Sequence, residues 1–444
     1  MLNKIKKNKT NILELILIFI ITLLFNLICN EISGDEIWNY GFSYNIATDL
    51  IPYKDFNMII TPLFPLIGAT FLNIFGKNII VFHILGSLIC TLIFYYMKKH
   101  IQKAYYIVYA ILLLFGLPNY NILCILFLYI LMTLENKKEN DYLIGIILGM
   151  TFLTKQNIGL YLSIPTIFTK NVKRIIKRII GFIIPNLIIL IYILSNNSLY
   201  EFIDYTFLGI DSFLTKNFYI EPLSIIIITV SIIYLFYQYI KNKDIKIIYL
   251  LSFILLVLPL IEFYHTMIAF IPTFGYFINK LKLNKKIIIM AFIFFIVSNF
   301  SINIYHIYQG KYTFPNITNE YKYRKITKNE DKGIKTISNY IKNTQNELYI
   351  ISRNAYLLKL ESNKPINKYD LLNNGNLGKN GEIKIINEIK QNCINKKCIF
   401  LVAENELIED TKSQYNRDII NYIINNYSIK ENIKNTNMIV YSNF

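Results

Sequence analysis

The sequence predicts an α-helical polytopic membrane protein with about 11 transmembrane helices and a small C-terminal α/β domain. Its composition is the first reason: 54% of the 444 residues are hydrophobic, and the mean hydropathy is +0.39. Such values are typical of membrane proteins that cross the bilayer many times. The second reason is a series of long apolar runs that stops near residue 308. The third is the placement of the basic residues, which give a net charge of +17 and cluster between those runs.

The first apolar run follows a basic start, MLNKIKKNKTNILELILIFIITLLFNLICN. It is long enough to cross a bilayer, which takes about 20 residues, and no small-residue cleavage site follows it. We therefore interpret it as a retained first helix. The predicted spans are 11–29, 78–97, 104–118, 121–134, 142–154, 157–169, 179–195, 222–240, 246–261, 265–279 and 286–308.

The apolar stretch 61–77 is too short for a confident span, and the basic residues decide its placement. If it lies flat on the outer surface, the basic clusters between the other spans all face the cytoplasm, as the positive-inside rule requires. Only Lys54, Lys77, Lys155 and Lys216 then face outward before residue 309. We therefore expect a juxtamembrane helix at 61–77, a cytoplasmic N-terminus and an outer C-terminus, in the cell membrane. This divides the chain into a membrane domain (1–308, with its first outer loop at 30–77) and an extracytoplasmic domain (309–444).

After residue 309, short apolar segments alternate with amphipathic helical patterns. The segments ELYIIS (347–352), CIFLVA (398–403) and NMIVYS (437–442) read as strands. Such alternation predicts an α/β domain with parallel strands. Cys393 and Cys398 either form a local disulfide, if this domain faces an oxidising compartment, or stay as two thiols. The cysteine spacing predicts no zinc site.

The first outer loop carries four acids, Asp35, Glu36, Asp49 and Asp55, among many aromatic residues. Aromatic side chains anchor a loop at the headgroup level. An acid held there is partly desolvated, which raises its pKa and suits a general base near neutral pH. The alternative is an ordinary solvated loop.

The stretch GDEIWNYGFSYNIATDLIPYKDFNMIITPLFPLIGATFLNIFGKN resembles the first outer loop of the GT-C class of integral membrane glycosyltransferases. Within that class it is similar to the branch that uses polyprenyl-phosphate sugars, which includes lipid A aminoarabinose transferases and protein mannosyltransferases. Two weaker similarities are GIILGMTFLTKQNIGLYLSIP (145–165), with Lys155 at the apex of a helical hairpin, and IEFYHTMIAFIP (261–272). The resemblance covers roughly the whole membrane part.

This resemblance implies that the enzyme moves a sugar from a polyprenyl-phosphate carrier to an acceptor on the outer face. The acceptor would be a glycan, a lipid or a protein, and the bilayer is the other partner; no nucleic acid, metal or cofactor is expected. Asp35 would be the catalytic base, and Glu36 would position acceptor or sugar. Transfer would invert the anomeric centre, because it is a single displacement with a phosphate leaving group.

The leaving phosphate needs cations, and four outward-facing groups are candidates: Lys77, His83, Lys155 and His265. Each has an ordinary alternative, namely a lysine at the lipid interface for Lys77, a packing histidine for His83 and a solvated lysine for Lys155. Glu262 and His265 either bind substrate or pair with each other.

Tyr53 and Asp55, in the IPYKDF stretch, are candidates for substrate binding; for Asp55 the alternative is a structural role that fixes the loop by hydrogen bonds. The chain departs from many relatives at LPNYNIL (117–123), where they carry an Asp that this chain lacks. Asn cannot accept a proton as a base, so this difference leaves the acceptor class open. The alternative function is a transporter or flippase for a lipid-linked glycan. Transporters usually show repeated halves and charges at mid-membrane, and this sequence shows neither.

Overall fold

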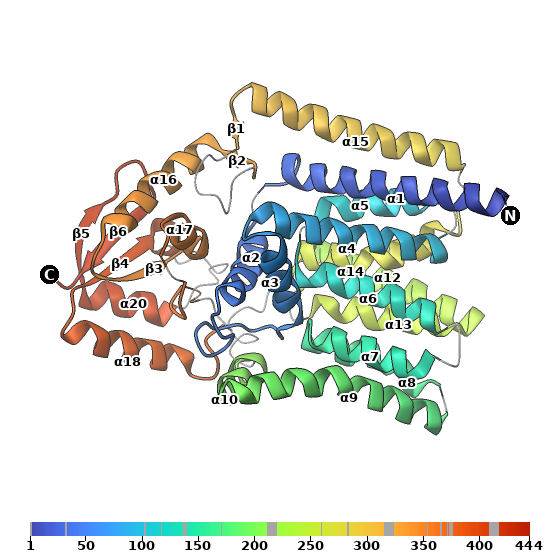
Figure 1. Cartoon of the computed structure of the whole chain (residues 1–444), viewed down its shortest axis with the longest axis horizontal. Coiled ribbons are helices and arrows are strands. Elements are labelled where there is room, and N and C mark those ends of the chain that lie inside the picture. The colour runs from blue at the N-terminus through green and yellow to red at the C-terminus, as the bar shows by residue number, and fades with distance from the viewer. Residues whose placement is uncertain are drawn as a thin grey trace.

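The computed structural model describes residues 2–31, 33–101, 104–116, 118–135, 140–169, 171–210, 220–258, 260–281, 284–314, 324–352, 354–364, 366–370, 372, 376–407 and 417–444, with side chains from residue 11 onward. A bundle of helices forms the larger part (Figure 1). Two short helices, α2 and α3, lie at one end of this bundle, and an α/β unit lies beyond them (Figure 1).

The helical part contains α1 (Leu2–Ile28), α2 (Gly34–Ala47), α3 (Leu63–Phe75), α4 (Ile79–His100), α5 (Tyr105–Phe115), α6 (Tyr120–Leu134), α7 (Asp141–Phe152), α8 (Gln156–Ile167), α9 (Val172–Ser195), α10 (Leu199–Ile203), the π-helical turn η2 (Asp204–Leu208), α12 (Pro222–Asn242), α13 (Ile245–Ile254), the 3-10 turn η3 (Leu255–Val257), α14 (Phe263–Ile278) and α15 (Lys285–Tyr308). The C-terminal part contains β1 (Tyr312–Thr313), β2 (Ile326–Thr327), α16 (Lys328–Asn343), β3 (Glu347–Ile351), α17 (Ala355–Glu361), α18 (Gly381–Ile394), β4 (Cys398–Ala403), α19 (Glu404–Leu407), α20 (Arg417–Asn426), β5 (Ser428–Asn432) and β6 (Met438–Ser442).

Each apolar segment expected to span the membrane coincides with a helix of the structure. Among the described residues, five of these helices are both long and apolar enough to cross a bilayer: α1, α4, α9, α12 and α15. The other six, α5, α6, α7, α8, α13 and α14, are 10 to 16 residues long. Because a full crossing takes about 20 residues, the count of eleven spans stays a prediction.

The stretch 61–77 forms α3, which packs against α2 at the end of the bundle nearest the α/β unit (Figure 1). The two helices approach closely at Gly68. A Cβ atom there would lie 2.2 Å from the hydroxyl oxygen of Ser43, so only glycine fits. The helix ends at Gly76, whose φ of 107° is readily adopted by glycine. This position agrees with the expected juxtamembrane helix.

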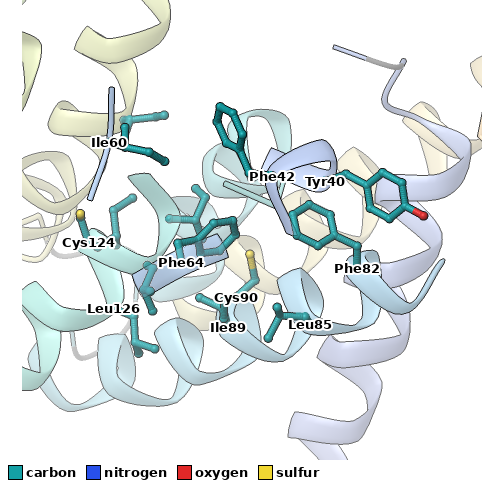
Figure 2. Packing of buried hydrophobic residues seen from close by; sticks show 14 of the residues in the cluster. Tyr40, Phe42, Ile60, Phe64, Phe82, Leu85, Ile89, Cys90, Cys124 and Leu126 are labelled. Carbon is teal, nitrogen blue, oxygen red and sulfur yellow. The ribbon is translucent and has the colours of Figure 1, made fainter. Parts of the chain in front are cut away.

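Aromatic residues fasten α2 to the bundle, as Figure 2 shows. Tyr40 of α2 meets Phe82 of α4 with ring centroids 5.7 Å apart, and Phe64 of α3 meets the same Phe82 at 5.9 Å. Phe42 of α2 stacks on Phe56 of the following loop at 6.0 Å. All of these side chains are buried. Edge-to-face and offset contacts of this kind are favourable for aromatic rings, so the first turn of α2 rests on a rigid base.

The opposite end of the bundle is rich in basic residues. Lys98 and Lys99 lie in the last turn of α4. At the start of α9, the Arg178 Nη2 atom donates to Glu135 at 2.8 Å, and its Nε atom donates to Asp141 at 2.8 Å. This buried ion network joins α6, α7 and α9.

The C-terminal unit contains a four-stranded sheet of order β3-β4-β6-β5. The prediction of parallel strands is right for β3 and β4 and wrong for β6, which runs antiparallel to both β4 and β5. The reason is a β5–β6 hairpin, whose turn includes Asn435 with a φ of 60°. The strand β5 is exposed throughout and carries no apolar run, so no apolar pattern marks it as a strand.

Helices cover both faces of this sheet. On one face, Ile389 of α18 and Ile423 of α20 form a buried cluster with Phe400 and Val402 of β4. On the other face, Leu401 of β4 belongs to a core that includes residues of α16 and α17 and continues into the membrane bundle. Cys393 and Cys398 are joined by a disulfide.

Three contacts join this unit to segments at the adjacent end of the bundle. At Gly41 of α2, an added Cβ would lie 2.1 Å from the ring of Tyr356 in α17. The Asn57 amide donates to the carbonyl oxygen of Asn376 at 2.7 Å. The Lys379 backbone N–H donates to Asp204 of η2 at 2.9 Å.

Candidate active site at the end of the helix bundle

The two acids of the first outer loop lie in the first turn of α2. Ser33 caps this helix, because its hydroxyl oxygen accepts the backbone N–H of Glu36 at 3.2 Å. Acids are favoured there by the positive end of the helix dipole. Successive helical residues point about 100° apart, so the side chains of Asp35 and Glu36 leave the helix in different directions.

The Glu36 side chain is fully buried and held by two partners. The Nε and Nη2 atoms of Arg324 each donate to one of its oxygens, both at 2.6 Å. The Nε2 atom of His83 lies 2.8 Å from Oε1. Burial alone would raise the pKa of Glu36, but the Arg324 charge and the hydrogen bonds lower it to about 2. Glu36 is therefore an ionised, fully engaged carboxylate in this structure.

The Asp35 side chain is partly exposed, and its surroundings differ from those of Glu36. Within the described ranges, no hydrogen-bond donor or ion-pair partner meets its carboxylate. Burial raises its pKa above the ordinary carboxyl value, and the nearby Glu262 adds to this effect. His265 and Lys155 oppose it, because their positive charge favours the ionised acid. The structure thus brings Asp35, Lys155, Glu262 and His265 together, although they come from three separate loops.

Lys155 caps α8 in the short turn after α7. Its Nζ atom donates to the Asn121 side-chain oxygen at 3.1 Å and lies 5.4 Å from the centre of the Tyr120 ring. Burial lowers the pKa of Lys155 to about 8, so it remains mostly protonated at neutral pH. Lys155 is therefore a cation that lies near the Asp35 carboxylate and forms no ion pair with it among the described residues.

The segment in which many relatives carry an Asp contributes amides to this site. Asn119 caps α6 by accepting the backbone N–H groups of Asn121 and Ile122, and its own amide donates to the Tyr264 hydroxyl at 2.6 Å. The Asn121 side chain accepts from Lys155 as described above. Both amides are thus used for positioning, and no carboxylate replaces the missing Asp at residues 119–121.

Within this group Glu262 and His265 also pair with each other, which was one of the two alternatives for them: Nδ1 of His265 lies 2.7 Å from the Glu262 carboxylate. Of the other candidates, Asp55 accepts the Ile51 backbone N–H at 2.7 Å, and the Tyr53 hydroxyl donates to the Ile60 carbonyl oxygen at 2.9 Å. Both bonds lie within the loop, and the first corresponds to the structural alternative for Asp55. Lys77 is exposed just before α4.

Sequence reasoning missed Arg324, Tyr264 and the role of Asn121. Arg324 lies 288 residues from Glu36, so no local pattern connects them. One signal was available: only five of the 46 basic residues are arginine. Arginine offers a rigid fork of donors that lysine cannot replace, and the described Arg174, Arg178 and Arg324 all contact carboxylates.

The site offers no obvious place for a metal ion. Among the described residues, no group of three or more His, Cys, Asp or Glu side chains is arranged to hold one. What the arrangement offers is a half-buried carboxylate with free lone pairs, a nearby ammonium group and an imidazole. Such a set can take a proton from one ligand and stabilise negative charge on another.

Comparison with known protein families finds no match, and neither does comparison with curated protein sequences. Solved structures do match. The structure of ArnT from Cupriavidus metallidurans bound to undecaprenyl phosphate aligns with a TM-score of 0.59 and 10% identity, over 98% of each chain. The apo structure of the same protein aligns with a TM-score of 0.57 and 10% identity, over 99% of this chain and 98% of that one.

An oligosaccharyltransferase from Archaeoglobus fulgidus aligns over 93% of this chain and 71% of its own, with 10% identity and a TM-score of 0.47. The alignments with ArnT cover both the helical bundle and the α/β unit, since they span nearly the whole chain. The chain therefore has the fold of ArnT, a lipid A aminoarabinose transferase of the GT-C class that the first outer loop resembles.

Proposed function

We propose that this chain is a membrane glycosyltransferase. It moves a sugar from a polyprenyl-phosphate carrier to an acceptor at the outer surface of the cell membrane, with inversion at the anomeric carbon. The observation that carries this proposal is the Asp35 carboxylate, which is half-buried and has no hydrogen-bond or ion-pair partner among the described residues. It lies near the Lys155 ammonium group and the His265 imidazole, at the bundle end where α2 lies.

The fold supports the choice of donor. ArnT, whose fold this chain shares, has been solved with undecaprenyl phosphate bound. A lipid phosphate carries negative charge close to the membrane surface, and a site for it needs a cation at that level. Lys155 is such a cation, because it lies in a turn between two apolar helices and its Nζ atom is held by a neutral amide rather than by a carboxylate.

The proposed reaction is one displacement. The acceptor oxygen bonds to the anomeric carbon while its proton passes to Asp35. The bond between that carbon and the phosphate oxygen breaks, and the phosphate leaves with the electron pair. Lys155 stabilises the leaving phosphate, and His265 assists, paired with Glu262. General-base catalysis contributes about 10²- to 10⁴-fold in rate, and charge stabilisation of this kind adds about 3 kcal/mol.

Glu36 holds the helix turn that carries Asp35 instead of touching substrate, because both of its oxygens accept from Arg324. From the sequence we expected Glu36 to position the acceptor or the sugar, whereas here it positions only the helix turn. Tyr53 and Asp55 hydrogen-bond within the 30–77 loop, and Lys77 at its end forms no ion pair with the described residues.

Two observations support the outer placement of the site. The basic residues gather at the opposite end of the bundle, as expected for the cytoplasmic side. The C-terminal unit, which docks at the Asp35 end, contains the Cys393–Cys398 disulfide, and disulfides persist in oxidising compartments.

The test compares Asp35→Asn with Asp49→Asn in the purified full-length chain. Asp49 belongs to the same loop, is exposed and has a φ of 65°. Asn tolerates that conformation, so this control changes the loop charge equally without touching the site. Lipid-linked sugars from native membranes serve as donor, with a native envelope extract as acceptor.

We expect transfer to fall at least about 10²-fold in Asp35→Asn and to stay near normal in Asp49→Asn. A folded Asp35→Asn chain that transfers sugar at the normal rate contradicts the proposed base. If the unaltered chain moves lipid-linked glycans across vesicle membranes and transfers none of their sugar, it is a transporter and the proposal fails.

A further inference from the structure

We propose that Arg324 is a positioning residue for this site, which acts through Glu36 to hold the first turn of α2 and so places the Asp35 carboxylate. This inference rests on the proposed function. Arg324 comes from the segment that leads into the C-terminal unit, so the proposal also gives that unit a part in assembling the site.

The first argument is that the guanidinium group has no unused donor. It has five N–H groups. Two of them bind Glu36, as described above. The others reach backbone carbonyl oxygens: Asn26 at 2.5 Å and Asn30 at 3.1 Å from Nη1, and Glu31 at 2.9 Å from Nη2. The side chain is also completely buried. A buried cation with every donor satisfied is geometrically fixed.

The second argument is what these five bonds join. Asn26 lies in the last turn of α1, where carbonyl oxygens lack partners inside the helix. A cation at this end also interacts favourably with the helix dipole. Arg324 therefore ties the end of α1, the connecting segment 30–31 and the start of α2 into one unit. Asp35 lies within that unit, directly before the residue that Arg324 binds.

The third argument is that Arg324 itself is held in place. It lies two residues before the start of β2, which pairs with β1 in an antiparallel ladder. Its neighbour Lys325 donates to the Cys29 carbonyl oxygen at 2.9 Å and to the Asn303 side chain at 2.6 Å. The residue that follows Arg324 is thus attached to the end of α1 and to α15.

The pH dependence of transfer reports whether Asp35 has moved. Burial raises the pKa of Asp35, so a looser α2 that exposes this carboxylate to water brings its pKa down toward the ordinary value. Removing the Arg324 charge has a limited direct effect on Asp35, because neither Arg324 nor Glu36 is among the charges that shift the pKa of Asp35. The charged and titratable groups that face Asp35 or Glu36 are Lys155, Glu262, His265, Tyr120, Tyr264, His83 and Arg324.

The experiment compares Arg324→Met, Arg324→Lys and the double variant Arg324→Met/Glu36→Gln with the unaltered full-length chain. The double variant removes both charges, so it leaves no unpaired buried ion and is the variant expected to fold. Undecaprenyl phosphate is added stepwise while the fluorescence of Trp38, the sole tryptophan, is recorded. The binding curve gives the fraction of chains that have an intact donor site. Turnover is then expressed per binding-competent chain, which separates misfolding from misplacement.

We expect the double variant to bind undecaprenyl phosphate within about threefold of normal and to lose roughly 10²-fold in kcat, the size of a misplaced catalytic group. The acid side of its pH profile moves to lower pH. Arg324→Lys keeps the positive charge but lacks the planar set of donors, so its kcat should lie between those of the unaltered chain and the double variant. Normal kcat per competent chain and an unmoved pH profile in the double variant would overturn the proposal.

Failure of the proposed function gives a different result. In that case the unaltered chain itself transfers no sugar, and hydrogen exchange of the α2 amides decides the role of Arg324. Exchange at least about tenfold faster in the double variant supports its hold on α2, and unchanged exchange overturns it.

Discussion

The carboxylates of Asp35 and Glu36 are neighbours in the sequence but have opposite surroundings in the structure. Glu36 is buried and receives two hydrogen bonds from Arg324, while Asp35 is half-exposed and receives none from the described residues. The pKa of Glu36 lies near 2, and that of Asp35 lies above the ordinary carboxyl value. The pair is therefore divided into one ionised structural acid and one acid whose pKa burial raises, as environment divides acid–base roles in other enzymes.

The acid side of the pH profile follows from the raised pKa of Asp35. The proposed base must be ionised, so transfer falls as the pH drops through that pKa. Glu262 contributes to the raised value through its negative charge. Replacing it in Glu262→Gln removes this charge, and the acid limb of kcat/KM should move to lower pH.

The measurement is kcat/KM from about pH 4 to pH 8, with Glu31→Gln as the control. Glu31 is an exposed acid near the start of α2 that is not among the charges acting on Asp35. A limb that stays in place in Glu262→Gln, or that moves equally in both variants, would argue against Asp35 as the titrating base.

The alkaline side of the profile should report Lys155. Burial lowers its pKa to about 8, so in the free enzyme its charge is lost as the pH rises through that value. Without the charge the donor phosphate loses its partner, and kcat/KM for the donor falls. Lys155→Arg keeps a charge at every working pH, so its pH profile should lack the alkaline limb. Its maximal kcat/KM should be lower, because the guanidinium group meets the Asn121 side chain with a different geometry.

The companion variants are Lys155→Met and Lys77→Met. We expect the first to lose about 10²-fold or more in kcat/KM and the second, which removes an exposed lysine beside the same loop, to lose little. A large loss in Lys77→Met with a small one in Lys155→Met would mean that Lys77 is the phosphate-binding residue.

Some of the approaches between site residues follow from the alternating direction of successive helices. Asp35, Lys155 and Glu262 each lie in a loop predicted to face outward, and helices that cross back and forth bring such loops to one end of the bundle. Arg324 was not predictable in this way. Its bond to Glu36 depends on how a separate domain folds back, and no periodicity in the sequence encodes that approach.

The strand directions of the C-terminal unit show a second limit. The apolar runs located β3, β4 and β6, because buried strands need apolar residues on both faces. They could not locate β5, whose five residues are all exposed. Without β5 the hairpin that reverses β6 is invisible, and an alternation of strands and helices then wrongly suggests parallel pairing throughout.

The contact between α2 and α17 gives a prediction about stability. A Cβ at Gly41 would lie 2.1 Å from the Tyr356 ring, so Gly41→Ala forces the two helices apart. Overpacking of this kind costs about 1–3 kcal/mol, more than the roughly 1 kcal/mol gained by Ala in a helix. Gly34→Ala is the matched control on the same helix, because a Cβ there meets nothing within 4 Å.

Thermal unfolding in detergent and limited proteolysis of the C-terminal unit measure this effect. Gly41→Ala should unfold at a lower temperature and release the unit faster, while Gly34→Ala should not. Adding Tyr356→Ala to Gly41→Ala should recover part of the loss, since it removes the clashing ring. Equal behaviour of the two glycine variants would show that α17 does not pack on α2.

The Cys393–Cys398 disulfide gives a prediction about the compartment of the C-terminal unit. If that unit lies outside the membrane, both cysteines are oxidised in living cells. Cells are lysed directly into a denaturant that contains a small maleimide, which blocks every free thiol, and the protein is then reduced and treated with a maleimide that carries a polyethylene glycol chain. Two polyethylene glycol chains should be added, one for each released thiol.

The control is Cys393→Ser, which leaves Cys398 unpaired and therefore blocked in the first step. This variant should gain no polyethylene glycol chain. The free cysteines Cys29, Cys90 and Cys124 are also blocked in the first step. If the unaltered protein gains no polyethylene glycol chain, Cys393 and Cys398 are therefore reduced in the cell. The outward placement of the Asp35 site would then lose the support of the disulfide.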